Sequence, residues 1–428
     1  MTFYFYTLGC KVNQYESQAM RETLLKNGFL PSDNSNADII IVNSCTVTAE
    51  SDRKTRQAVR RFRKNNPDAI IVVTGCMTQA SPESARSLGS ADIIIGNKNI
   101  DELPILINRF ISDKSKITNI VPHSKDDIYS TPLISNFDER TRAFVKIEDG
   151  CERYCTYCII PTARGRVRSK SIDDLKKEVS NLVEKGYCEI VLVGINLSAY
   201  GKDNGLNLCD AIDAVCEFDE IKRVRLGSLE PDHISNEMLS RLAAQKKFCP
   251  QFHLSLQSGC DATLKRMNRH YDSAFYYDLV SRIRSIFSNA AITTDIMVGF
   301  AGETDDEFAR SLIFAKEVGF AKAHIFSYSR RKGTFADKMP NQVENSIKEE
   351  RSRAMIKETL ICEKEFLLSQ IGMVSQVLFE TYENDFAYGY TANYCRVKVK
   401  CKEHPGNIIL NVKIEKIDEA MCLIGEFV

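Results

Sequence analysis

The sequence predicts an α/β fold in three parts: an open parallel sheet at the amino-terminal end, a partial (β/α)6 barrel similar to a TIM barrel, and a small all-β module at the carboxyl end. Two observations lead to this fold class. Short apolar runs alternate with amphipathic stretches over residues 1–100 and again from Arg142 to about Ser327, as in parallel sheets covered by helices. After residue 370 short β-rich runs follow one another between turns.

The predicted amino-terminal domain spans residues 1–111, with strand-like runs at 3–8, 39–43, 70–74 and 92–95. A first helix is expected to open near Asn13, because Glu16 follows at the capping-box spacing. Another is expected at Ser81-Pro82, where proline takes the first helical position. Residues 112–140 are rich in Ser, Asp, Lys and Pro, and we interpret them as a linker.

The barrel domain is predicted over residues 141–370. Its six strand-like runs are 143–147, 189–193, 223–226, 252–256, 292–298 and 322–327. Helix starts are expected at Ser171 and Thr304, each with an acidic residue three positions on. Six successive βα units favour a barrel or part of one, and a long charged helix over 346–369 leads out of it. The β module, 371–428, has predicted strands at 375–379, 396–400, 408–413 and 421–427.

Composition limits the function classes. The chain has 57 Lys or Arg and 57 Asp or Glu, so no global field indicates a nucleic-acid partner, and any such site has to be local. No apolar run approaches the roughly 20 residues that span a bilayer, and the first residues lack a signal peptide, so we expect a cytoplasmic protein without a membrane partner. In such a protein, 15 cysteines favour metal or redox chemistry over disulfides.

Three of the cysteines, Cys151, Cys155 and Cys158, lie on one loop directly after the first predicted barrel strand. Three thiolates at this spacing suit a [4Fe–4S] cluster that leaves its fourth iron open for another ligand. The carboxyl ends of barrel strands are also where such folds build their sites. A structural zinc ion completed by a distant ligand is the alternative.

Three further cysteines, Cys10, Cys45 and Cys76, are far apart in the sequence but each falls just beyond the end of a predicted strand. In a parallel sheet these positions share the carboxyl edge, where open α/β sheets bind ligands. Three convergent thiolates again match a cluster with one free iron. The alternative is three small, buried, inert residues at three turns.

The loop cysteines, with the aromatic Tyr157 directly before Cys158, resemble the radical S-adenosylmethionine (SAM) superfamily. That resemblance implies that an external electron donor reduces the cluster, which cleaves SAM to methionine and a 5′-deoxyadenosyl radical. By analogy, SAM would be bound at the ends of successive barrel strands. The residues expected to bind it are Tyr157, Gly194, Asn196, Ser228, Glu230, Gln257 and Gly299.

Segments 7–17, 43–48 and 164–169 extend the resemblance to the methylthiotransferase family. It implies a second [4Fe–4S] cluster on Cys10, Cys45 and Cys76, a radical SAM barrel, and a TRAM domain at the carboxyl end. The motif Gly-Cys-Lys-Val-Asn-Gln at 9–14 is most similar to the family members acting on threonylcarbamoyladenosine at position 37 of tRNA. Action on isopentenyladenosine tRNA or on a ribosomal protein aspartate, and a non-catalytic RNA-binding metalloprotein, are the alternatives.

Two basic segments are candidates for contacts with tRNA phosphates. The helix expected after Cys45 carries Arg53, Arg56 and Arg60 on one face, although a solvated surface helix would look the same. The second segment follows the loop cysteines and contains Arg164, Arg166 and Arg168. The β module has more acidic than basic residues, so its RNA contacts are expected from Tyr388, Tyr390 and Tyr394. No acid–base residue is assigned, because cofactors would carry the hard chemistry.

Overall fold

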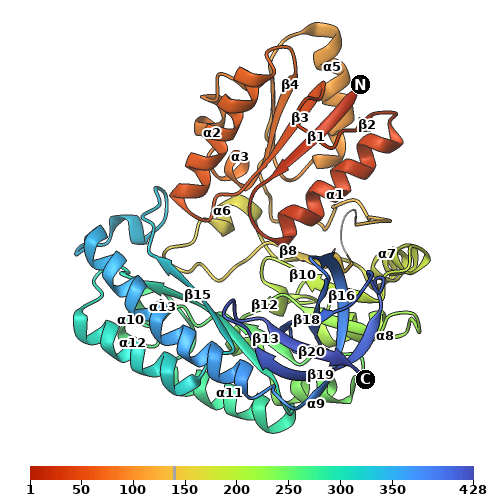
Figure 1. The fold of residues 1–428 in the computed structure, drawn as a ribbon. Helices are drawn as coiled ribbons and strands as arrows, with labels where there is room; N and C mark the ends of the chain where they lie inside the picture. The colour runs from red at the N-terminus through yellow and green to blue at the C-terminus, as the bar shows by residue number, and fades with distance from the viewer. Residues whose placement is uncertain (138–140) are drawn as a thin grey trace.

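The computed structural model describes residues 1–137 and 141–428, and it has the three predicted parts (Figure 1). The amino-terminal sheet is entirely parallel, in the order β2 (Leu30–Pro31), β1 (Thr2–Thr7), β3 (Ile39–Ser44), β4 (Ile70–Gly75), β5 (Ile93–Ile95) and β6 (Ile117–Asn119). Strands β3 and β4 are buried along their whole length, as expected for apolar strands with helices on both faces.

Helices cover both faces of this sheet. Side chains of α1 (Lys11–Lys26) and α5 (Leu103–Asp113) pack into one core, and α2 (Ala49–Asn65), α3 (Cys76–Ala80) and α4 (Pro82–Arg86) pack into the other. A short 3-10 helix, Ile100–Glu102, leads into α5. Helix α4 begins after Ser81 with proline at its first position, which confirms that predicted start.

Two expectations for this domain were wrong. Helix α1 begins at Lys11 with Cys10 at its cap position, and Asn13 and Glu16 are buried inside it. Their side chains make tertiary contacts: Asn13 Nδ2 donates to Ser44 O at 3.0 Å, and Glu16 pairs with Lys146. The predicted linker, 112–140, contains β6, which pairs with β5, so the sheet extends to Asn119. A three-residue edge strand carries too little periodicity to be seen in sequence, and residues 138–140 of that stretch lie outside the described residues.

The six predicted barrel strands are confirmed. They are β7 (Ala143–Lys146), β10 (Glu189–Val193), β11 (Arg223–Leu226), β13 (Gln251–Leu254), β14 (Ala291–Val298) and β15 (Lys322–Ser327), with the short β12 (Ser228–Leu229) beside β13. They form two parallel sheets, β11-β10-β7 and β12-β13-β14-β15. Strands β7 and β15 are not paired with each other in the described structure, so the barrel is partial. Helix α1 lies against β7 at the open edge.

The barrel helices are α7 (Ile172–Glu184), α8 (Leu208–Cys216), α9 (Asn236–Ala244), α10 (Asp261–Arg266), α11 (Ser273–Ile286), α12 (Asp305–Val318) and α13 (Asn345–Leu368). Smaller elements are β8 (Glu148–Asp149), β9 (Arg168–Ser169), α6 (Ile160–Arg164) and the 3-10 turns Leu197–Ala199, Pro231–His233 and Ala336–Lys338. Both predicted caps are confirmed: Ser171 accepts the Asp174 N–H, and Thr304 with Glu307 forms a capping box. Among the described residues no helix is long and apolar enough to cross a membrane.

The carboxyl module is a closed barrel of β16 (Val374–Glu383), β17 (Phe386–Thr391), β18 (Arg396–Lys400), β20 (Leu423–Phe427) and β19 (Ile409–Ile417). Strand β17 was not predicted. It forms a hairpin with β16 through Asn384 and Asp385, whose φ values of +52° and +63° are those of a type I′ turn. This Asn-Asp pair is the signal that sequence reasoning overlooked.

The module docks at the amino-terminal ends of the first barrel strands. Arg225 Nη1 donates to Ala392 O at 2.9 Å, and Arg223 Nη2 donates to Gln376 O at 2.6 Å. Tyr390 and Tyr394 stack with ring centroids 4.7 Å apart, and the Arg142 guanidinium lies 4.9 Å from each ring. These two tyrosines, expected to contact RNA, therefore hold the module to the barrel.

Candidate metal and cofactor site

The loop cysteines follow β7 and β8 at the carboxyl end of the barrel. Hydrogen bonds fix the backbone of the loop: Cys151 N–H donates to Gly165 O at 3.0 Å, and Thr156 N–H donates to Met267 O at 3.1 Å. Burial, with a smaller contribution from neighbouring thiols, raises the pKa of Cys151 and of Cys158 to about 12. A bound metal reverses this preference, because a coordinated thiol loses its proton.

A buried arginine lies beside this loop. Arg269 Nη1 donates to Cys155 Sγ at 3.3 Å, and the same guanidinium pairs with Glu230. Arg153, on the loop itself, pairs with Asp232 at 2.7 Å. Arg269 thus offers a buried hydrogen-bond donor to Cys155, which suits a thiolate or the sulfur of an iron–sulfur cluster.

The other three cysteines come together as the strand ends predicted. Strands β1, β3 and β4 are neighbours, with Thr7, Asn43 and Thr74 aligned in register, so the residues that follow them share one edge. Gly9 makes the close approach possible: its φ is +106°, and a Cβ there would lie 3.2 Å from Cys45 Sγ. Burial raises the pKa of Cys76 to about 12, an effect that Arg164 opposes and that Cys45 and Cys10 strengthen.

Arg164 links the helix that follows the loop cysteines to the other cysteine group. It belongs to α6, directly after the loop cysteines, and is fully buried. Its guanidinium reaches the other domain, where Nη2 donates to Cys76 Sγ at 3.1 Å and to Glu16 Oε2 at 2.9 Å. Helix α3, which begins at Cys76, lies against α6 at the junction between the domains (Figure 1). Both cysteine groups therefore border the same junction.

These donors fit iron–sulfur clusters. In each group the other two thiols help to raise the pKa of one member, Cys76 among the strand-end cysteines and Cys151 among the loop cysteines, so the three lie close together. Gly9 leaves room where a Cβ would crowd Cys45. In residues 1–137 and 141–428, no three His, Cys, Asp or Glu side chains are arranged as ligands of a single metal ion. A [4Fe–4S] cluster does not require that arrangement, since each thiolate binds a different iron.

The residues expected to bind SAM lie at the carboxyl ends of consecutive barrel elements. Gly194 and Asn196 follow β10, Gln257 forms a bridge with Ile296 of β14, and Gly299 follows β14. Ser228 is the first residue of β12, which Glu230 follows, and Tyr157 packs edge-on against Phe300 at 6.2 Å. The structure thus gathers the predicted residues at the edge of the barrel that also holds the loop cysteines.

Glu148 is a polar residue at this edge that sequence reasoning missed. It is fully buried, its Oε2 accepts the Asn196 N–H at 2.7 Å, and burial raises its pKa well above the usual range. Glu148 Oε1 and Asn196 Oδ1 have no hydrogen-bond partner among the described residues. Buried polar atoms are normally hydrogen-bonded, so both can receive a ligand's donors. An acidic residue directly after a predicted barrel strand was the available signal.

The tRNA contacts expected from Arg164 and Arg168 were wrong. Arg164 is committed to the junction, and Arg168 is 6% exposed, with Nη1 donating to Arg164 O and Arg166 O at 2.8 Å. Both neutralise Asp149, so their charges are needed inside the protein. Arg166 is exposed. On α2, Arg53 and Arg60 are exposed and Arg56 is half-buried.

Comparisons with known proteins agree with this architecture. Residues 2–96 match the uncharacterized protein family UPF0004, and residues 145–315 match the radical SAM superfamily. The threonylcarbamoyladenosine tRNA methylthiotransferase MtaB of Bacillus subtilis is 36% identical over 97% of this chain and 94% of its own length. Its Thermotoga maritima counterpart is 39% identical over 88% of this chain and 86% of its own.

A second type of relative is also similar. The tRNA-2-methylthio-N(6)-dimethylallyladenosine synthase of Clostridium perfringens is 34% identical over 99% of this chain and 96% of its own length. Among solved structures, the radical SAM methyltransferase TsrM of Kitasatospora setae shares the fold, with a TM-score of 0.56 at 12% identity over 77% of this chain and 75% of its own. The chain therefore belongs to the radical SAM methylthiotransferases, sulfur-transferring enzymes that use SAM and a [4Fe–4S] cluster.

Proposed function

We propose that this enzyme installs a methylthio group at C2 of N6-threonylcarbamoyladenosine 37 in tRNA, giving 2-methylthio-N6-threonylcarbamoyladenosine. The observation that carries the proposal is the meeting of the two cysteine groups at one junction, where Arg164 of one domain contacts Cys76 of the other. A radical generator alone explains how a C–H bond is broken. A second thiolate site beside it explains where a sulfur atom would be held.

In this proposal the enzyme holds two [4Fe–4S] clusters, one on Cys151, Cys155 and Cys158 and one on Cys10, Cys45 and Cys76. When bound, the clusters and SAM supply the radical and the sulfur, and an external donor supplies the electron. The residues that bind SAM are Tyr157, Gly194, Asn196, Ser228, Glu230, Gln257 and Gly299. Among them, Glu230 is held in place by Arg269. We assign the three parts as methylthiotransferase domain, radical SAM domain and TRAM module, the first extending to Asn119.

The choice of tRNA rests on two supports. The relatives from Bacillus subtilis and Thermotoga maritima are both named for threonylcarbamoyladenosine tRNA, and the motif at 9–14 is of that type. We assign Arg53, Arg56, Arg60 and Arg166 as contacts to tRNA phosphates, because none of them is fully buried. Arg164 and Arg168 are not part of this set.

Isopentenyladenosine tRNA is the second candidate substrate. The Clostridium perfringens relative, named for dimethylallyladenosine, matches nearly the whole chain at 34% identity. Both nucleosides carry their modification at N6 of the same base, so both would bring C2 to the same reacting position. The two differ in the N6 group, which is anionic in one and apolar in the other.

Nucleoside mass analysis of tRNA from a strain lacking the gene, with and without the gene restored, tests the proposal. Loss of 2-methylthio-N6-threonylcarbamoyladenosine, with accumulation of its unthiolated precursor, supports it. Loss of the methylthio-isopentenyl nucleoside instead supports the second candidate. If neither nucleoside changes, both proposed tRNA substrates are wrong, and a ribosomal protein aspartate becomes the target to examine. Anaerobic iron quantitation should give about eight irons per chain if two cubane clusters are present.

A further inference from the structure

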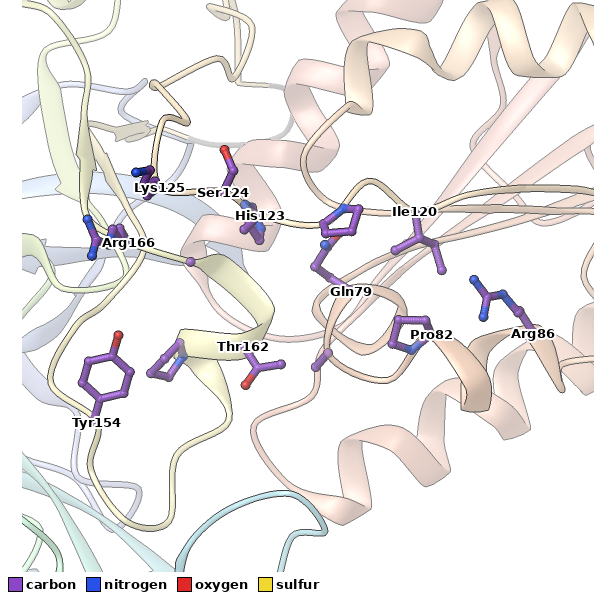
Figure 2. Close-up of a pocket in the computed structure, with 14 residues that line it drawn as sticks. Gln79, Pro82, Arg86, Ile120, His123, Ser124, Lys125, Tyr154, Thr162 and Arg166 are labelled. Atoms are coloured by element: carbon purple, nitrogen blue, oxygen red, sulfur yellow. The ribbon is translucent and has the colours of Figure 1, made fainter.

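A groove runs along the junction between the amino-terminal domain and the barrel. It consists of two adjoining cavities of about 550 and 740 Å³ that share Ala80, Pro82 and Arg86. One cavity extends from these residues to the loop of Tyr154 and to α6, and the other extends to Arg330 and Lys332 after β15. Figure 2 shows the first cavity, with Tyr154 and Arg166 on one side and Arg86 on the other. We call the two cavities together the junction groove.

The junction groove is strongly basic, although the whole chain has equal numbers of acidic and basic residues. Its lining includes two acidic residues, Asp52 and Glu83, and Asp52 is already paired with Arg331 at 2.9 Å. The basic residues that line it are Arg56, Arg86, Lys125, Arg166, Arg330, Arg331 and Lys332. Such a local excess of positive charge favours a polyanion.

These cations are largely available to a ligand. Within the described parts of the chain, Arg86, Lys125 and Lys332 make no salt bridge, and all three are exposed. Arg330 pairs with Asp337 and Arg166 with Glu152, but both arginines are about 60% exposed, so these pairs are weak. A phosphate can replace either carboxylate at little cost.

Tyr154 adds an aromatic surface to one end of the groove. Tyr154 is 62% exposed, a high value for an aromatic residue. Its backbone φ is +50°, which is unusual for a bulky residue. Asn268 Nδ2 holds this conformation by donating to Tyr154 O at 3.1 Å. A ring kept in water next to Cys155 by a constrained loop is suited to stack on a nucleobase.

Residues of both domains line the groove, and a loop of the barrel domain holds the two domains together there. Ala49 N–H donates to Ser329 Oγ at 3.3 Å, Arg331 pairs with Asp52, and Ala336 N–H donates to Thr156 O at 2.8 Å. The barrel loop that contains Ser329, Arg331 and Ala336 therefore contacts both the start of α2 and the loop that carries Cys151, Cys155 and Cys158. Arg330 and Lys332 are thereby held beside the amino-terminal domain before any ligand arrives.

The groove also lies close to the reacting centre. Ala80 is the last residue of α3, which begins at Cys76, and Pro161 and Thr162 lie just after Cys158. We propose that the junction groove binds the sugar–phosphate backbone of single-stranded RNA next to the target nucleotide, and that Tyr154 stacks on a base of that strand. This inference rests on the proposed function and names the surface that would hold its substrate.

The first test is RNA binding measured by fluorescence anisotropy, with a labelled anticodon stem-loop made of unmodified nucleotides. The triple variant R86Q/R330Q/K332Q should bind about tenfold or more weakly, and its dependence on salt should fall by about 0.7 to 0.9 in log–log slope for each lost phosphate contact. The matched control is R310Q/K316Q, which neutralises two exposed cations on α12, outside the groove. The proposal would be overturned if the triple variant bound the RNA within twofold of the affinity of the control and showed the same salt slope as the control.

The second test separates stacking from charge. Tyr154→Ala should weaken binding of the same RNA by about 5-fold to 100-fold without changing the salt slope, whereas Tyr154→Phe, which keeps the ring, should bind as the native enzyme does. Equal RNA affinities for the native enzyme and both variants would show that Tyr154 does not stack on a base. Circular dichroism and thermal melting of each variant check that the fold is retained.

Failure of this inference is distinguishable from failure of the proposed function. If the triple variant binds RNA normally while tRNA from the deletion strain lacks the methylthio nucleoside, the groove assignment is wrong and the function stands. If the variant loses RNA binding but tRNA nucleosides are unchanged in the deletion strain, the groove is an RNA site and the substrate assignment is wrong.

Discussion

The two cysteine groups differ in how the chain assembles them. Cys151, Cys155 and Cys158 lie within one short loop, whereas Cys10, Cys45 and Cys76 are brought together by three parallel strands. Each group has a buried arginine that donates to a thiol. Arg269 comes from the same barrel as the loop cysteines, but Arg164 crosses from the barrel to the amino-terminal domain. The loop group is therefore complete within one domain, and the strand-end group is completed only when two domains dock.

The junction that completes the strand-end group is held by buried charges. Lys146 Nζ donates to Glu16 Oε1 at 2.8 Å and to Asp149 Oδ2 at 2.7 Å, and Arg164 pairs with the same two carboxylates. Buried charges are tolerated when each is paired, and removal of one partner leaves the rest uncompensated. The junction is consequently both specific and sensitive to single substitutions.

The largest effect is expected from removing the thiols of either group. C151A/C155A/C158A should abolish both 5′-deoxyadenosine formation and methylthiolation. C10A/C45A/C76A should abolish methylthiolation alone, with iron content falling to about half of the native value. Chromatography of the SAM products, nucleoside mass analysis and iron quantitation measure these effects. Identical behaviour of the two triple variants would show that the groups do not have separate roles.

The next largest effect is expected for Arg164→Ala. It should lower the free energy of unfolding by about 3 to 5 kcal/mol, because Glu16 and Asp149 lose a buried partner. Urea denaturation measures the loss, and limited proteolysis should cut faster between residues 120 and 137. Arg269→Ala is the matched control: it removes an arginine from the other thiol group but should leave that cleavage rate unchanged. Equal cleavage of both variants would contradict the assignment of Arg164 to the junction.

A smaller effect is expected at the other domain boundary. Arg142→Ala removes the guanidinium that packs on Tyr390 and Tyr394 and pairs with Glu380. A cation–π contact of this kind contributes roughly 1 to 2 kcal/mol, so we expect a loss in that range by urea denaturation. Arg396→Ala, which removes a cation–π contact with Tyr388 inside the module, serves as the control and should not loosen the docking of the module. A loss as large as that of Arg164→Ala would show that the two boundaries do not differ.

The smallest effect is expected on the exposed face of α2. Arg53 is 61% exposed and forms its salt bridge with Glu50 of the same helix, so Arg53→Gln should leave the thermal midpoint unchanged. If Arg53 contacts a phosphate, the log–log salt slope of RNA binding should fall by roughly 0.7 to 0.9. An unchanged slope would remove Arg53 from the residues assigned as phosphate contacts.

Local patterns in the sequence were sufficient for much of this protein. The spacing of Cys151, Cys155 and Cys158 and the caps at Ser171 and Thr304 depend on residues a few positions apart, and the barrel strands depend on apolar runs of their own. The strand-end cysteines also followed from local pattern, because a parallel sheet aligns the ends of its strands. Each of these features reflects short-range geometry or a rule of sheet topology.

Tertiary structure alone decided which charges and rings remain free. Arg164, Arg166 and Arg168 look equivalent in sequence, yet the first and third are buried against Asp149 and only Arg166 is exposed. Tyr390 and Tyr394 look like an RNA-binding surface, yet they pack against Arg142. Residue type and spacing determine what a side chain can do chemically. Its exposure depends on which distant segment packs against it, and that is set by the docking of whole domains.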